Sequence, residues 1–173
     1  RNKFGDKIEL CHRIDKQTSG CLVLAKNKKS VKHFSNLSKA NQIKKNYIAV
    51  VKGKFKGKEV ISNEIYKKNS LKLKKSKSVF KLVRHLKKAS IVSVDIQTGR
   101  THQIRIHASQ LQHPILFDNK YGDVLFNKAI DIDFRRTLAL HANSISFKDQ
   151  NSKVIKVTAK YPDELKNLIE ALM

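Results

Sequence analysis

The sequence predicts a mixed α+β fold, with a mainly antiparallel central sheet, flanking helices and a cleft that holds the functional residues. Two observations lead to this fold class. Strand-like segments outnumber helical ones, and neighbouring strands are joined by short polar turns, as in β-hairpins. The expected strands are rich in β-branched and aromatic residues. They cover 8–15, 20–26, 44–52, 59–65, 78–86, 90–98, 138–147 and 153–160.

Three segments have the periodicity of helices. Residues 28–41 carry apolar side chains at three-residue spacing, which predicts an amphipathic helix capped by Asn27 or Ser30. Residues 101–112 place apolar side chains on one face and end before Pro114. The remaining expectations are a C-terminal helix opened by Pro162 and a loop with one helical turn over 123–136. Residues 66–77 are expected to be a lysine-rich loop, which is either a solvated surface hairpin or a direct contact with RNA.

The charge balance points to a polyanionic partner. Lys and Arg number 37 against 14 Asp and Glu, a formal net charge of +23 over 173 residues. Such an excess opposes compaction by self-repulsion, and binding to nucleic acid phosphates would relieve it. A lysine-rich habit of the source genome is the alternative explanation. An anionic membrane fits less well, because we find neither a basic amphipathic helix with a Trp/Phe/Leu face nor an apolar run of spanning length.

Only two cysteines are present, Cys11 and Cys21, which excludes a zinc site built on cysteines. With no signal peptide in view, we expect two reduced thiols, packed as small core residues of a cytoplasmic protein. The chain opens on Arg1, yet Ile8 already looks like part of a folded element. We therefore expect it to be part of a longer protein.

Two segments could carry chemistry. In the first, His12 to Gly20, Asp15 ends an apolar segment and enters a polar turn. That position suits catalysis at a sheet edge, and equally suits an ordinary turn-initiating aspartate.

The second segment, 98–107, places two arginines and two histidines at the expected start of a helix, where free N–H groups favour an anion. His102 and His107 are five residues apart, so they do not share a helix face as zinc ligands would, and we expect no metal. A hydrogen-bonded core position is the expectation for His107.

These residues lie within longer motifs. HRIDKQTSG followed by CLVLAK, KKNYIAVVKG, TGRTHQIRIHASQLQHPILFDNKYGD and LHANSISF together resemble the signatures of the RluA-type family of RNA pseudouridine synthases. The resemblance runs from about Glu9 to the C-terminus. HPILFDNKYGD followed by Phe126 looks most like the members that act on large-subunit (23S) ribosomal RNA. The resemblance implies the pseudouridine synthase catalytic-domain fold, an isomerase activity on rRNA uridines, no DNA or membrane partner, and a monomer.

The resemblance also implies roles for single residues. Asp15 matches the family's nucleophile, and Arg105 the arginine that pairs with it and keeps it ionised. Tyr47 matches the tyrosine that packs against the target base, and Ile106 the aliphatic residue on its other side. Arg13 matches an arginine that enters the RNA where the base has left. Further substrate contacts are expected from Arg100, Thr101 and His102.

The implied reaction breaks the N1–C1′ bond of uridine, rotates the base and rejoins it through C5. No group is lost and nothing is oxidised, so no cofactor is expected. Asp15 could attack the sugar, attack the base, or remove the C2′ proton, and the sequence leaves these open.

Relatives carry earlier strands, and often a small S4-like RNA-binding domain, before the HRID motif. Over 1–173 we therefore expect a catalytic domain without those parts. Two other functions compete: a basic RNA-binding module without catalysis, and a ribonuclease using His12, His102 and His107. The combination of Asp15, Tyr47 and Arg105 favours the synthase, because neither alternative needs it.

Overall fold

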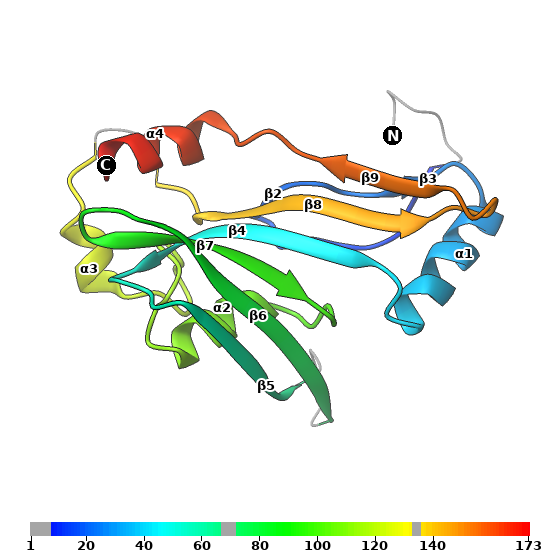
Figure 1. Cartoon of the computed structure of the whole chain (residues 1–173), viewed down its shortest axis with the longest axis horizontal. Coiled ribbons are helices and arrows are strands. Elements are labelled where there is room, and N and C mark those ends of the chain that lie inside the picture. Colours follow the sequence, from blue (N-terminus) through cyan, green and yellow to red (C-terminus); the bar gives the residue numbers. More distant parts are fainter. Residues whose placement is uncertain (1–7, 67–71, 133–135) are drawn as a thin grey trace.

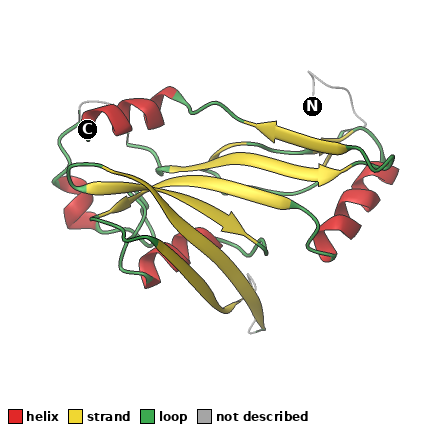
Figure 2. Cartoon of the chain, in the orientation of Figure 1, coloured by secondary structure: helices red, strands yellow, loops and turns green. Residues whose placement is uncertain are grey.

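The computed structural model describes residues 8–66, 72–132 and 136–173. Seven of the strands in these residues form one large, mainly antiparallel sheet with helices around its periphery, and two others pair separately, which confirms the predicted fold class (Figures 1 and 2). The sheet has the order β2-β8-β4-β7-β6-β5, and β9 also pairs with β8. Its members are β2 (Ser19–Gly20), β4 (Lys44–Lys52), β5 (Lys58–Tyr66), β6 (Leu73–His85), β7 (Ala89–Ile96), β8 (Leu140–Lys148) and β9 (Val154–Thr158).

Four helices flank this sheet. They are α1 (Lys28–Lys39), α2 (Gln103–Gln110), α3 (Val124–Lys128) and α4 (Asp163–Ala171). The side chain of Asn27 accepts a hydrogen bond from the Ser30 backbone N–H, so Asn27 is the cap of α1. The α3 helix supplies the helical turn expected within 123–136, of which 133–135 lie outside the described residues. No helix in the described ranges is long and apolar enough to cross a membrane.

The main core lies where the central strands meet α2 and α4. Val50 and Val51 of β4 and Val92 and Val94 of β7 are completely buried there. Because adjacent side chains of a strand point to opposite faces, the burial of both Val50 and Val51 means that both faces of the sheet are covered at this point. A second, smaller cluster joins Phe34 and Leu37 of α1 to Ile43 and Ile145. Cys11 and Cys21 are free thiols at the margin of this second cluster, half-buried rather than in the core.

The predicted lysine-rich loop over 66–77 is wrong where the structure describes it. Tyr66 ends β5, and 73–77 belong to β6, which pairs antiparallel with β5 as a projecting hairpin (Figure 1). Residues 67–71 lie outside the described part of the chain. Lysine has a low strand propensity, but here the partner strand and the buried serines Ser76 and Ser78 determine the conformation.

The expected strands at 8–15 and 20–26 are also much shorter than predicted. Only β1 (Glu9–Leu10) pairs with β3 (Leu24–Ala25), and β2 adds two residues in parallel to β8. Between them the segment 12–18 leaves the sheet and turns toward β4 and the residues before α2. This departure from regular pairing makes one wall of a cleft.

Candidate active site

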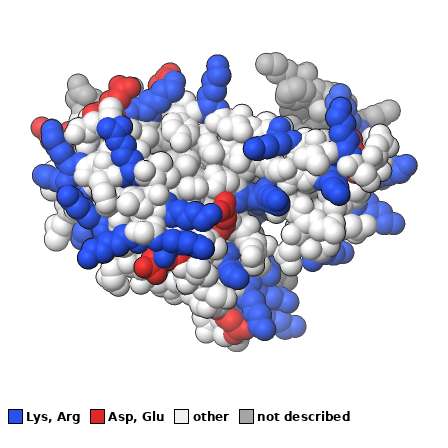
Figure 3. Space-filling model, viewed as in Figure 1, with Lys and Arg blue, Asp and Glu red and all other residues white. Residues whose placement is uncertain are grey.

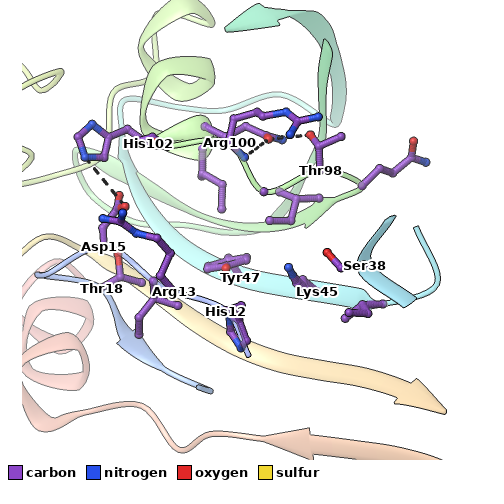
Figure 4. A pocket seen from close by; sticks show the side chains of 18 of the residues that line it. His12, Arg13, Asp15, Thr18, Ser38, Lys45, Tyr47, Thr98, Arg100 and His102 are labelled. Atoms are coloured by element: carbon purple, nitrogen blue, oxygen red, sulfur yellow. Dashed lines mark hydrogen bonds and ion pairs between the residues drawn. The ribbon is translucent and has the colours of Figure 1, made fainter. Parts of the chain in front are cut away.

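A cleft of about 690 Å³ lies between the 12–18 segment, the start of β4, and residues 97–105. Asp15, Tyr47 and Arg105 all line it, although 32 and 58 residues separate them along the chain. Figure 4 shows Asp15 below His102, with Tyr47 and Lys45 side by side on β4. The structure therefore brings the three predicted catalytic residues into one cavity.

Arg105 holds two carboxylates at once. Its Nε and Nη2 donate to Oδ2 and Oδ1 of Asp118, both at 2.7 Å, and its Nη1 donates to Oδ2 of Asp15 at 3.4 Å. Hydrogen bonds with Asp118 raise the pKa of Arg105, so the guanidinium stays charged. Asp15 thus lies beside a fixed positive charge, while the shorter bidentate contact goes to Asp118.

Asp118 is the main residue that the sequence analysis missed. Its side chain is 1% exposed, and its Oδ1 also accepts from the backbone N–H groups of Lys120 and Tyr121. Burial alone would raise its pKa, but hydrogen bonds from Arg105 and these two N–H groups hold the pKa of Asp118 below its usual value. The available signal was its place in the HPILFDNKYGD motif, which carried no assigned role.

His102 lies at the cleft in a strained backbone conformation. It caps α2 with φ 54° and ψ 22°, in the left-handed region that residues other than glycine rarely adopt. Its Nδ1 is 3.1 Å from the Tyr121 hydroxyl, and its Nε2 is 4.0 Å from Asp15. Burial lowers the pKa of His102, while the charge of Asp15 opposes that shift. A neutral ring beside Asp15 can exchange a hydrogen bond with substrate.

Tyr47 projects from an irregular stretch of the sheet. Opposite it, β8 has one residue more than β4, because Asn46 pairs with Ser144 and Ile48 with His141. Burial, and then the charge of Asp15, raises the pKa of Tyr47 to about 12. The phenol is therefore protonated at neutral pH, and its ring packs against the main core while still lining the cleft.

The segment that carries Asp15 continues into β2, which pairs with β8 beside this bulge. Gly20 has φ 109°, and a Cβ at this position would lie 2.2 Å from the Ala142 carbonyl oxygen, so only glycine allows β2 to approach β8. Three residues after Asp15, the Thr18 backbone N–H closes the turn on the Asp15 carbonyl at 2.9 Å. Thr18 Oγ1 is the one buried side-chain polar atom without a partner in the described chain, and Thr18 lines the cleft.

Of the other predicted substrate residues, some line the cleft and one does not. Arg13 is exposed at the cleft, and Thr101 lines it. Arg100 also lines it, and its Nε donates to the Lys75 carbonyl. The α2 helix begins at Gln103, two residues after the predicted start at 101. Ile106 lies outside the lining of the cleft, because successive helical side chains diverge by about 100° and Arg105 already faces the cavity. The aliphatic lining comes instead from Ile14, Ile43, Ile96, Ile104 and Leu140.

The three histidines of the ribonuclease alternative do not meet. His107 is fully buried behind α2, where its ring nitrogens are 2.9 Å from Ser78 Oγ and 2.7 Å from Asn63 Oδ1. Burial lowers the pKa of His107 to about 4. His12 stacks on Phe34 and accepts a hydrogen bond from the Val23 N–H. The predicted core position of His107 is confirmed, and its burial keeps it out of the cleft that His12 and His102 line.

The cleft is strongly basic. Its lining includes one carboxylate, Asp15, and six cationic side chains: Arg13, Lys39, Lys45, Lys75, Arg100 and Arg105. On the face shown in Figure 3, Lys and Arg gather over the projecting β5–β6 hairpin and outnumber the acidic side chains. An anionic polymer that crosses the cleft would meet cations on both sides of Asp15.

Comparison with known proteins places these features in a family. Residues 1–110 match the family model described as RNA pseudouridylate synthase. The chain is 31% identical, over 95% of its length, to the ribosomal large subunit pseudouridine synthase C of Haemophilus influenzae, and covers 55% of that protein. It is 33% identical to the protein of that name from Buchnera aphidicola subsp. Acyrthosiphon pisum, covering 99% of this chain and 58% of that one. The chain thus spans about half the length of the curated relatives it matches.

Solved structures agree on the fold. The human RNA pseudouridylate synthase domain containing 1 superposes with a TM-score of 0.77 at 26% identity, over 95% of this chain and 80% of that chain. The human RNA pseudouridylate synthase domain containing 4 gives a TM-score of 0.81 at 22% identity, over 95% and 76%. The second likeness supports the fold alone.

Proposed function

The chain belongs to the RNA pseudouridylate synthase family, as its motifs predicted, and we propose that it isomerises specific uridines of large-subunit (23S) ribosomal RNA to pseudouridine. The observation that carries the proposal is the contact between Asp15 and Arg105 in a basic cleft that Tyr47 also lines. A purely RNA-binding module has no need of a half-buried carboxylate among six cationic side chains, because that charge repels phosphate.

Asp15 is the proposed nucleophile. The N1–C1′ bond of uridine breaks, Asp15 stabilises the separated sugar or base covalently or by taking the C2′ proton, and a C5–C1′ bond then forms. The proton on C5 leaves and N1 gains one, so the product is an isomer of the substrate. Arg105 places a positive charge 3.4 Å from the Asp15 carboxylate, in a cavity from which the bound nucleotide excludes water.

Tyr47 is proposed to hold the freed base. Its ring and the Ile104 side chain both line the cleft, and a flat uracil is proposed to turn between these two surfaces without escaping. A phenol with a pKa of about 12 stays protonated at neutral pH, so the Tyr47 hydroxyl is not itself the base that accepts the C5 proton. We assign that proton to a water molecule held by the hydroxyl.

The target uridine has to leave its stack to reach Asp15, because a paired base keeps its glycosidic bond inside the helix. Arg13 is exposed at the cleft, two residues before Asp15, and is proposed to fill the space that the base vacates. Thr101 and His102 are proposed to contact the flipped nucleotide from the α2 side. The partner is then structured RNA, met in the cytoplasm, and the protein acts as a monomer without a cofactor.

The test is to map pseudouridines in the 23S rRNA of the source organism with and without the full-length gene, and to restore the gene as Asp15→Asn. We expect one or a few pseudouridines to disappear on deletion and to stay absent with Asp15→Asn, while the purified variant still binds the RNA. Asp131→Asn, at an exposed position far along the chain, is the matched control and should restore every site. Measurable turnover by pure Asp15→Asn would exclude Asp15 as the nucleophile.

A further inference from the structure

Lys45 stands out among the cations of the cleft because of its place on β4. It precedes Tyr47 by two residues, so both side chains leave the same face of the strand about 7 Å apart. Figure 4 shows the Lys45 side chain beside Tyr47, on the side of Ser38 and opposite Thr98. That separation puts the Lys45 ammonium within one nucleotide of a base stacked on Tyr47.

The charge of Lys45 has no counter-ion in the described chain. Lysines elsewhere pair with carboxylates: Lys52 with Asp123 at 2.6 Å, and Lys81 with Asp95 at 3.2 Å. In the cleft the one carboxylate is Asp15, which pairs with Arg105 at 3.4 Å and has the His102 ring 4.0 Å away. Lys45 is nevertheless half-buried.

The surroundings of Lys45 offer no replacement for a carboxylate. Its Nζ lies near Gly99, where a Cβ would be 3.7 Å away, so that neighbour brings no side chain. Burial lowers the pKa of Lys45, and the lysine charge in turn adds to the burial that lowers the pKa of His12. Partial burial of an unpaired ammonium costs free energy of folding, and a bound anion would recover it.

Resting on the proposed function, we propose that Lys45 binds one of the two phosphodiester groups that flank the target uridine and so fixes the ribose over Asp15. Phosphate is the anionic group that RNA offers, and the spacing to Tyr47 reaches only the adjoining linkages. Exposed lysines such as Lys39 attract any phosphate through screened charge. Lys45, held in the cleft wall, instead sets where one particular phosphate lies, which makes it a positioning residue.

The effect of losing Lys45 should therefore fall on the rate with bound RNA. Lys45→Met keeps the length and apolar stem of the side chain and removes the charge. We expect the single-turnover rate at saturating RNA to fall roughly 10- to 100-fold, as for loss of one charge-assisted hydrogen bond, with a smaller change in Kd. Lys45→Arg should recover most of the rate, because it restores a donor cation. Lys156→Met, on β9 outside the lining of the cleft, also removes one lysine charge and should leave the rate at saturation nearly unchanged.

The decisive experiment makes one linkage neutral. Synthetic stem-loops carry the uridine found by mapping, with a single methylphosphonate either 5′ or 3′ to it, and are converted by the wild-type protein, Lys45→Met and Lys156→Met. The wild type should lose roughly 10- to 100-fold at one of the two linkages. Lys45→Met should lose nothing further at that linkage, and should lose as much as the wild type at the other.

Multiplicative losses in Lys45→Met at both linkages would overturn the proposal, as would a wild-type rate for Lys45→Met. A fold defect is separated by melting each variant, and by the Lys45→Arg arm. Failure of the wild type to convert the all-phosphate stem-loop would count against the proposed function itself. Conversion of the all-phosphate stem-loop by the wild type therefore tests the proposed function, and the methylphosphonate stem-loops test the role of Lys45.

Discussion

Replacing Asp118 by Asn tests whether the buried ion pair beneath the cleft supports both the fold and the chemistry. Arg105 and Asp118 are 6% and 2% exposed, and two hydrogen bonds of 2.7 Å join them. Asp118→Asn removes the charge but keeps an oxygen for the N–H groups of Lys120 and Tyr121. Breaking a buried pair by removal of one partner costs about 3–5 kcal/mol, because the other charge is left uncompensated. For a chain of this size that corresponds to a fall in Tm of between about 6 and 20 °C.

The rate should fall as well. Without Asp118 the guanidinium of Arg105 is free to rotate toward Asp15, and a displacement of about 1 Å near the reacting atoms can cost about 10²-fold. RNA affinity should change little, since Asp118 does not line the cleft. The assays are thermal melting, single-turnover conversion and an RNA titration. Asp163→Asn, which removes one end of the exposed Lys166–Asp163 pair, is the control and should leave both Tm and rate unchanged.

A double variant separates the two consequences. Asp118→Asn with Arg105→Met removes both charges, while the amide oxygen still accepts from the N–H groups of Lys120 and Tyr121, and replacing both ends of a buried pair is often neutral for stability. We expect Tm to recover most of what Asp118→Asn loses, while conversion stays undetectable because Asp15 has lost its cation. If Asp118→Asn melted with the wild type and kept its rate, the pair would have neither role, and the reasoning from burial would be refuted.

Three further expectations follow. Tyr47→Phe should bind RNA as the wild type does but complete isomerisation at least about 10-fold more slowly, measured by tritium release from C5-labelled uridine. An unchanged rate would leave the Tyr47 hydroxyl without a function. Because the folded-state pKa of His107 is about 4, below the usual 6.5, the neutral ring contributes about 3 kcal/mol to the free energy of unfolding above pH 6.5, and this contribution is lost as the pH falls toward 4. In His107→Gln the dependence of Tm on pH should therefore be flatter in that window. Replacing Lys74 and Lys75 of the β5–β6 hairpin by Gln should weaken binding to all RNAs alike and lower the slope of log affinity against log salt by up to about 0.9 per residue. The control is Lys156→Gln on β9. A loss of affinity for the target RNA alone would mean that the hairpin reads sequence or shape.

Much of the fold could be predicted because its strongest elements satisfy local and global preferences together. In 44–52, and in the strands β7 and β8, apolar runs coincide with buried central strands, and the Asn27 cap agrees with the amphipathic period of α1. The start of β6 could not be predicted in this way. Its buried face there carries Ser76 and Ser78, whose hydroxyls lie within hydrogen-bonding distance of His107, so the alternation is one of small polar and charged residues rather than apolar and polar ones.

The candidate site divides along the same line. Asp15, Tyr47 and Arg105 lie in motifs that the sequence displays, and they do share a cleft. The role of Asp118 could not be predicted, because its contact with Arg105 depends on the chain reversing after α2, and no spacing rule connects residues 13 positions apart across such a turn. The left-handed backbone of His102 escaped for a related reason: a histidine adopts it only where surrounding contacts, here with Tyr121, fix the ring.

The way Arg105 is shared explains how one guanidinium can serve structure and chemistry together. Asp118 takes the two short hydrogen bonds through Nε and Nη2, so the orientation of Arg105 is set from beneath and does not depend on substrate. Asp15 receives only the 3.4 Å contact from Nη1. A short bidentate bond to Asp15 would occupy both its oxygens and oppose its attack, whereas a longer single contact leaves Oδ1 free to react. In the proposed reaction, Asp118 therefore keeps Arg105 from binding the nucleophile too tightly, and its loss should slow chemistry even where the fold survives.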